Sequence, residues 1–184
     1  KMGNFLAGSD YNVAVECGSR DTIDLMVFSG FYSIDQSYAF ECNPYAADLC
    51  RRNLKYSQAN IKLVEKAVYN TDQKIHFYSV DALDENSNIG ASSILENSNM
   101  NEPVTKIEVD AIRLDTFMEQ ESIDKIDILI MDLQETELLA LEGLGERISD
   151  VGRILLEGTM THENTYYNEG CTIEEIKDYL ESKG

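Results

Sequence analysis

Four acidic residues each directly follow a short apolar run, and their positions would build one binding edge. The runs are VAV, YAF, ILIM and ILL, and the acids that follow them are Glu16, Glu41, Asp132 and Glu157. Parallel strands end at the same edge of an open sheet, and ligands bind there. One acid at a strand end needs no ligand, because strand ends are solvated, but the same pattern in four runs favours a site. Such an edge attracts cationic groups and accepts hydrogen bonds from paired hydroxyls.

The loop after the first run, CGSRDT, narrows the choice of ligand. Dinucleotide-binding loops use the spacing G-x-G-x-x-G, which lets backbone N–H groups reach a pyrophosphate. Here Gly18 is the single glycine, and Asp21 adds a negative charge where a phosphate would approach. The loop therefore disfavours a nicotinamide-dependent reductase and favours S-adenosylmethionine, which carries a sulfonium, an ammonium and a ribose diol. Glu41 would accept hydrogen bonds from the diol, and the Gly18 backbone would lie against the methionine moiety.

Alternating strands and helices are needed to bring these acids together. The sequence predicts strands at 12–17, 37–42, 61–68, 74–80, 104–112, 125–132 and 152–158, and helices at 22–29, 44–57, 114–121, 135–148 and 172–182. The run KIDILIMD is apolar almost throughout, as expected of a strand that is buried on both faces. The alternation predicts an α/β fold with a doubly wound, mostly parallel, Rossmann-like sheet.

One long connection, from Asp81 to Pro103, interrupts this alternation. It is rich in Asn, Ser and Asp, and connections of such length inside a compact domain are usually functional or disordered. Its middle, IGASSIL, is largely apolar. We therefore expect a polar, lid-like loop at 81–103 whose middle docks over a site, within a single domain that spans 1–184.

Composition restricts the class of protein. The net charge of −19 over 184 residues argues against nucleic acid and anionic membrane surfaces as partners, since both bind basic patches. No apolar run approaches the ~18 residues of a membrane span. The four cysteines show no C-x-x-C spacing, which predicts reduced thiols and a cytoplasmic location rather than a disulfide framework or a zinc site.

Several segments are similar to one known family. From about Asn12 to its end, the chain resembles the FkbM family of S-adenosylmethionine-dependent methyltransferases, through VECGSRD, AFECNP, KAV, GASS, RLDTF and IDKIDILIMDLQETELLALEGLG. The last segment is the most specific. The resemblance implies the Rossmann-like sheet of class I methyltransferases and S-adenosylmethionine as the cofactor. It also suggests a small-molecule acceptor, either a sugar or another small polar metabolite.

The resemblance also assigns roles to residues. Glu16 to Ser19 would line the cofactor loop, Glu41 would hold the ribose, and Asp132 would lie near the transferable methyl group. The cofactor-binding residues that it implies are Glu16, Cys17, Gly18, Ser19, Asp21, Glu41, Cys42, Asn43, Ala67 and Asp132. Ser92, Ser93 and Glu157 would face the substrate.

Two departures from the family pattern raise an alternative. The family usually has a second glycine where this chain has Thr22, and a Gly-Ala pair where it has Glu135 and Thr136. Larger side chains would narrow the site, so a catalytically inactive relative that binds the cofactor or a partner is a second hypothesis. The chain also stops where the family continues, so we expect the final strands of the sheet to be missing.

Two residues are candidates for a catalytic base. Methyl transfer is an in-line displacement in which a protein mainly positions the reactants and excludes water, but a hydroxyl acceptor also benefits from a base. Asp132 is the first candidate, although a cofactor contact or a helix cap would explain it equally well. His162, in the loop after the last predicted strand, is the second. A divalent metal between Asp132 and Glu157 would fit their chemistry, but no spacing demands one, so no metal ligand is predicted.

Overall fold

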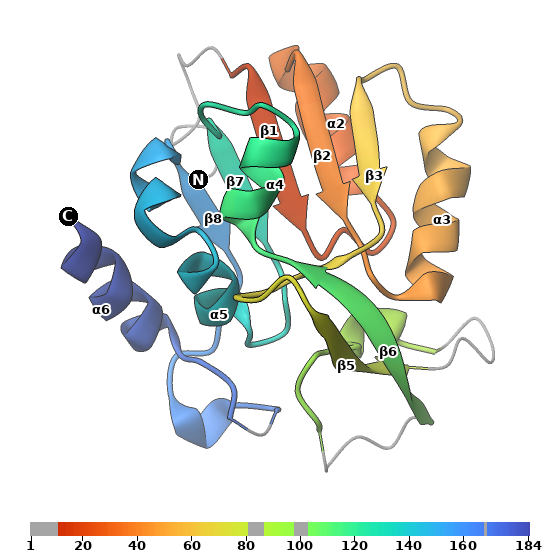
Figure 1. Ribbon diagram of the computed structural model, residues 1–184. Helices are drawn as coiled ribbons and strands as arrows, with labels where there is room; N and C mark the ends of the chain where they lie inside the picture. Colours follow the sequence, from red (N-terminus) through yellow and green to blue (C-terminus); the bar gives the residue numbers. More distant parts are fainter. Residues whose placement is uncertain (1–10, 81–86, 98–102, 168) are drawn as a thin grey trace.

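The computed structural model describes residues 11–80, 87–97, 103–167 and 169–184 (Figure 1). Its strands are β1 (Val13–Cys17), β2 (Gln36–Phe40), β3 (Ile61–Val64), β4 (Ala67–Val68), β5 (Lys74–Val80), β6 (Val104–Ile112), β7 (Ile128–Met131) and β8 (Ile154–Leu156). Its α-helices are α2 (Ile23–Tyr32), α3 (Pro44–Leu54), α4 (Leu114–Gln120), α5 (Glu137–Glu142) and α6 (Ile173–Lys183). Short 3-10 helices are η1 (Ile89–Ala91), η2 (Gly145–Asp150) and η3 (His162–Asn164). Within these ranges no helix is long and apolar enough to cross a membrane.

Parallel strands form the central sheet, in the order β3-β2-β1-β7-β8. β1 pairs with β2 on one side and with β7 on the other, so that Val15 lies opposite both Tyr38 and Leu129. The chain therefore builds outward from β1 in one direction and later returns to its other side. This reversal creates a switch in strand order between β1 and β7, beside which such sheets bind ligands. The predicted α/β, Rossmann-like fold is confirmed.

The central sheet is apolar on both faces, and helices cover both. On one face Val15 and Leu129 belong to the larger core, together with Phe117 of α4. On the other face Ala14 packs in a second core that includes Leu25 of α2. Figure 1 shows α4 in front of the sheet and α2 behind it. Alternate residues of each strand thus enter two different cores, as the side-chain period of two requires.

A second sheet has the strand order β4-β6-β5, with β5 and β6 antiparallel. The prediction of one strand over 61–68 is wrong in this respect. The chain leaves the central sheet after Val64 and pairs Ala67 and Val68 with β6 instead. The change places Val68 in the larger core beside Ile112. The segment 61–68 has the continuous residue pattern of a single strand, but its pairing with the distant strand β6 divides it into two.

The helix predicted over 135–148 is also divided. α5 ends at Glu142, and η2 follows it. A side chain at Gly143 would overlap with the backbone oxygen of Tyr69, and Gly145 has a left-handed φ of +55°. The close approach of the β4–β5 segment explains the glycine at position 143, and the left-handed Gly145 explains why regular helix does not continue.

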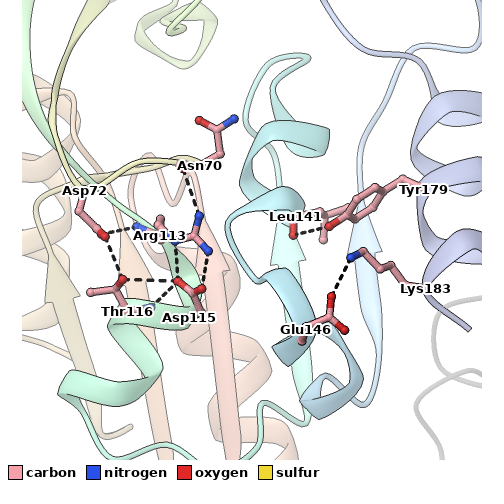
Figure 2. A network of polar contacts seen from close by, with 9 residues as sticks. All are labelled: Asn70, Asp72, Arg113, Asp115, Thr116, Leu141, Glu146, Tyr179 and Lys183. Atoms are coloured by element: carbon pink, nitrogen blue, oxygen red, sulfur yellow. Dashed lines mark hydrogen bonds and ion pairs between the residues drawn. The ribbon is translucent and has the colours of Figure 1, made fainter.

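A polar network fixes the start of α4 to the second sheet (Figure 2). The Arg113 guanidinium donates to both carboxylate oxygens of Asp115 and to the backbone oxygen of Asn70. Asp72 accepts from the Arg113 backbone N–H and from the Thr116 hydroxyl, each at 2.9 Å. The N-cap residue Arg113 makes no side-chain capping bond. Asp72, from the turn before β5, therefore holds the N-cap residue and a first-turn hydroxyl, while the N–H groups of Asp115 and Thr116 donate to the Gly143 backbone oxygen and to the Asp115 carboxylate.

The C-terminal helix α6 is capped at its start and is attached to its neighbours along its second half. Thr172 and Glu175 form a capping box at its start. Near its end, the Tyr179 hydroxyl donates to the backbone oxygen of Leu141 at 3.4 Å, and Lys183 lies 3.1 Å from Glu146 (Figure 2). α6 is thereby held against α5 and η2.

Replacement of Asp72 tests the cap of α4. We expect Asp72→Ala to lower the free energy of unfolding by about 1–2 kcal/mol, because two donors at the helix start lose their acceptor. Asp124→Ala, at an exposed turn residue, should change it by less than ~0.5 kcal/mol. Urea unfolding followed by circular dichroism measures both values. A loss in Asp72→Ala no larger than that of the control would contradict the capping role.

Candidate functional site

A cavity of about 910 Å³ opens at the carboxyl edge of the central sheet. Its volume lies in the range of ~300–1,000 Å³ that is typical of small-molecule sites. All the residues predicted to bind cofactor or to face substrate line it: Glu16, Cys17, Gly18, Ser19, Asp21, Glu41, Cys42, Asn43, Ala67, Ser92, Ser93, Asp132 and Glu157. Their roles stay predictions, but the fold brings them to one cavity.

Gly18 lies where three strands of the sheet end. The backbone N–H groups of Gly18 and Ser19 both donate to the Phe40 oxygen at 3.0 Å, and that of Asp132 donates to the Cys17 oxygen at 3.0 Å. Gly18 has a φ of +84°, and a side chain there would overlap with the backbone oxygen of Asp132. A glycine is required for both reasons. The single glycine of the loop thus allows the ends of β1, β2 and β7 to meet.

Glu41 follows β2 and is almost fully buried, with 8% of its surface exposed. One carboxylate oxygen accepts from the Arg20 backbone N–H at 2.8 Å, and the other accepts from the Asn43 backbone N–H at 2.7 Å. Burial raises the pKa of Glu41 to about 7, while the backbone donors oppose this shift. A picture of Glu41 as a solvated strand-end acid is therefore incorrect. Each carboxylate oxygen can accept further hydrogen bonds, so a ligand diol still finds acceptors here.

Glu16, at the penultimate position of β1, is the second buried acid of the cavity. It is 6% exposed and accepts a hydrogen bond from the Ser19 hydroxyl. Its pKa is raised to about 7, chiefly by burial and to a smaller extent by the negative charges of Asp24, Asp21 and Glu41, against the lowering effect of the Ser19 hydrogen bond. The cavity therefore holds two carboxylates that a nearby positive charge would keep ionised.

The segment 88–94 forms one wall of the cavity and is anchored by its serines. The Ser92 hydroxyl accepts from the Val80 backbone N–H at 2.9 Å and from the Asn43 amide at 2.8 Å. Ser93 pairs with Tyr78 through both backbone groups, and its hydroxyl donates to the Gln134 backbone oxygen at 3.2 Å. The described middle of the predicted lid is thus a fixed wall. The rest of that prediction, at 81–86 and 98–102, lies outside the described residues.

One end of the cavity is apolar, and the sequence reasoning did not identify it. Val27 and Phe31 of α2 are 67% and 79% exposed, and they line the cavity together with Ile130 and Leu155 of the sheet. The available signal was the spacing of Ile23, Val27 and Phe31, which places three apolar residues on one helix face. Val27 and Phe31 extend the site beyond the acids at the strand ends, whereas Ile23 is not among the described residues that line the cavity.

Comparison with known proteins identifies the family. A family model described as "Methyltransferase FkbM domain" matches residues 16–184. The chain belongs to this family. No curated protein and no solved structure matches it. The family model includes every strand end of the cavity, so the cavity lies within the matched FkbM domain.

Thr22 and Glu135, at which the chain departs from the FkbM pattern, occupy left-handed positions. Their φ angles are +64° and +70°, where glycine would be free of strain. Neither is among the described residues that line the cavity, whereas Thr136 is. The Thr22 hydroxyl instead donates to the Asp21 backbone oxygen at 2.6 Å. The side chains of Thr22 and Glu135 therefore do not narrow this FkbM cavity.

The two predicted catalytic residues are separated. Asp132 is exposed on the cavity wall. His162, in η3, is not among the described residues lining the cavity, and its Nε2 atom lies 3.3 Å from Glu175 at the start of α6. This geometry favours a surface contact of His162 with Glu175 rather than contact with a ligand. In the described ranges no cluster of three or more His, Cys, Asp or Glu is arranged to hold a metal ion.

A third buried carboxylate, Glu137, lies behind the cavity at the start of α5. It is 1% exposed. One carboxylate oxygen accepts a hydrogen bond from the Leu133 backbone N–H at 2.6 Å, and the other accepts one from the Cys171 thiol, with 3.7 Å between sulfur and oxygen. Burial raises its pKa to about 7, against the effect of the backbone donors. The folded chain therefore retains a proton on Glu137 that the unfolded chain releases near pH 4.5. The stability from this group is complete below that pH and is lost as the pH rises through about 7.

The Glu137→Gln variant tests this linkage, because glutamine is neutral and retains an acceptor for Leu133. We expect its free energy of unfolding, relative to the parent, to rise by about 2 kcal/mol between pH 5 and pH 7.5. Glu119→Gln, at an exposed position of α4, is the control. Urea unfolding at several pH values gives both curves. A pH-independent difference for Glu137→Gln would show that its carboxyl group is ionised in the folded protein throughout.

Proposed function

We propose that the chain is an S-adenosylmethionine-dependent O-methyltransferase that acts on a hydroxyl of a sugar or another small polar metabolite. The buried Glu41 carboxylate carries this proposal, since it lies in the cavity beside the switch in strand order. Backbone N–H groups already hold it in place, so it can accept hydrogen bonds from a ribose diol without rearrangement. Membership of the FkbM family supports the methyltransferase class.

The residues of the cavity fit such a cofactor. Glu16, Glu41 and Asp132 line the space with carboxyl groups, and a ligand that carries a sulfonium and an ammonium would favour their ionised forms. Gly18 presents backbone without a side chain at the meeting point of the strands. A pyrophosphate would instead face three acids, so the same set of residues disfavours a dinucleotide.

The chain itself would contribute positioning and proton transfer. When bound, S-adenosylmethionine supplies a methyl group that its sulfonium already activates. The protein would hold the acceptor in line, exclude water and accept the proton that the acceptor hydroxyl loses. We assign the last role to Asp132, which is exposed on the cavity wall.

The inactive alternative receives less support than the enzyme. It rests on the bulk of Thr22, Glu135 and Thr136 near the cofactor. Because Thr22 and Glu135 are outside the described lining of the cavity, Thr136 alone supports it. We therefore favour an active methyltransferase.

Ligand-induced stabilisation tests the choice of cofactor. At a ligand concentration ~100 times the dissociation constant, S-adenosylmethionine or its demethylated product should stabilise the fold by about 2.7 kcal/mol. For a chain of this size, the melting temperature would rise by about 5–10 °C. NAD at the same concentration should have no effect. Equal shifts with NAD, or no shift with any of the three, would contradict the proposed function.

Replacement of Glu41 tests the ribose contact. Glu41→Ala removes the acceptor of two charge-assisted hydrogen bonds and should weaken binding of the demethylated cofactor by about 2–4 kcal/mol, or ~30- to 1,000-fold. The unliganded melting temperature should also fall, because the Arg20 and Asn43 N–H groups lose their acceptor. Glu157→Ala, at an exposed acid of the same cavity, is the control. Calorimetric titration measures both affinities, and a change below threefold for Glu41→Ala would exclude the ribose role.

A further inference from the structure

Hydrogen bonds link Asp132 to a side chain that lies outside the described lining of the cavity. Gln134 Nε2 donates to Asp132 Oδ1 at 2.7 Å, and Gln134 Oε1 accepts from the Tyr167 hydroxyl at 3.0 Å. The same hydroxyl lies 2.7 Å from the backbone oxygen of Ala91, so its one hydrogen is shared between two acceptors. The contacts join the turn after β7, the cavity wall at η1 and the loop before α6.

The Gln134 amide has one favourable orientation in this arrangement. Its N–H faces a carboxylate and its oxygen faces a hydroxyl. The flipped amide would place its oxygen against the Asp132 carboxylate, where neither atom can donate a hydrogen bond. The backbone of Gln134 has a left-handed φ of +55°, which a non-glycine residue adopts at some cost. Both side-chain hydrogen bonds help to offset that cost.

Glu135 anchors the loop that carries Tyr167. Its carboxylate accepts from the backbone N–H of Tyr166 at 2.9 Å, from that of Tyr167 at 3.1 Å and from the Thr159 hydroxyl at 2.7 Å. A side chain at Gly170 would overlap with this carboxylate, so the loop packs closely around it. Tyr167 is 6% exposed. The hydroxyl of Tyr167 is therefore presented from a constrained backbone.

We propose that Gln134 and Tyr167 are positioning residues that hold the Asp132 carboxylate in one orientation on the cavity wall. The inference rests on the proposed function and adds to it, because an oriented carboxylate would face the sulfonium and the acceptor hydroxyl. An exposed aspartate without such support samples several rotamers, and the productive geometry is then less populated. Tyr167 is not among the described residues lining this cavity, so it acts through Gln134.

Binding of two ligands that differ in charge at sulfur provides the test. S-adenosylmethionine has a sulfonium, and its demethylated product has a neutral thioether, so the ratio of their affinities reports the charge that faces the sulfur. Isothermal titration gives this ratio for the parent, Asp132→Asn, Gln134→Met and the double variant. Methionine is close to glutamine in size and forms neither hydrogen bond. Tyr167→Phe is compared with Tyr166→Phe, whose parent residue is 73% exposed.

We expect Asp132→Asn to reduce the preference for the sulfonium about three- to tenfold, as one lost charge contact at a partly solvated site would do. Gln134→Met should reduce it by a smaller factor, because the Asp132 carboxylate keeps its charge but loses its fixed orientation, and the double variant should show no loss beyond that of Asp132→Asn. Tyr167→Phe should have a smaller effect, and Tyr166→Phe none. A purely structural role would weaken both ligands equally and leave the ratio unchanged, which would overturn the inference.

A measurement without ligand tests the contacts themselves. The side-chain amide signals of Gln134 can be assigned by nuclear magnetic resonance, since they disappear in Gln134→Met. They should shift in Asp132→Asn and in Tyr167→Phe but not in Tyr166→Phe. If the Gln134 amide signals do not shift in Asp132→Asn, the positioning role is overturned. If the parent binds neither ligand, the proposed function fails, whereas ligand binding with an unchanged ratio in the variants rejects the positioning role alone.

Discussion

The position of β1 between β2 and β7 governs the geometry of the whole site. Parallel pairing on both sides ends the three strands at one level, and backbone hydrogen bonds from Gly18, Ser19 and Asp132 join their ends. At this junction the chain comes so close to the backbone oxygen of Asp132 that only glycine fits at position 18. The acids after the strands are consequently held at fixed separations by backbone, which is stiffer than any side-chain contact.

Burial of carboxylates is the energetic cost of this arrangement. Glu16 and Glu41 are largely removed from water, and their pKa values rise to about 7 as a result. Backbone N–H groups compensate part of the cost at Glu41. The part of the desolvation cost that remains favours a cationic ligand, because a positive charge in the cavity would stabilise the ionised forms of both Glu16 and Glu41. Under the proposed function, the sulfonium of the cofactor would gain affinity because it lowers the cost of burying these carboxylates.

Elements outside the central sheet complete the cavity. The β5 strand carries Tyr78, whose backbone pairs with Ser93 and so fixes the wall formed by 88–94. The second sheet is in turn tied to α4 by Asp72 and Arg113. Glu135 fixes the loop before α6, and the Tyr167 hydroxyl of that loop contacts Ala91 in the same wall. In this way residues that never contact the cavity determine the shape of its wall.

The sequence by itself determined the fold class and the line of acids at the strand ends. Both follow from local pattern. An apolar run followed by an acid places that acid at the end of its strand, whichever strand it pairs with, and parallel strands share one carboxyl edge. For the same reason Glu16, Glu41, Asp132 and Glu157 line one cavity, whereas Ala67, Ser92 and Ser93 reach it from β4 and from the segment 88–94.

Tertiary contacts decided the rest, because they join residues that are distant in sequence. Pairing with β6 divided the segment 61–68 between two sheets. The left-handed Gly145 follows the end of α5, and His162 lies beside Glu175 of α6 rather than in the cavity. The partners of Glu135, which turn a departure from the family pattern into an anchor, lie 24 to 32 residues further along the chain. No local pattern encodes such contacts, since each depends on where the completed sheet places the loops that follow its strands.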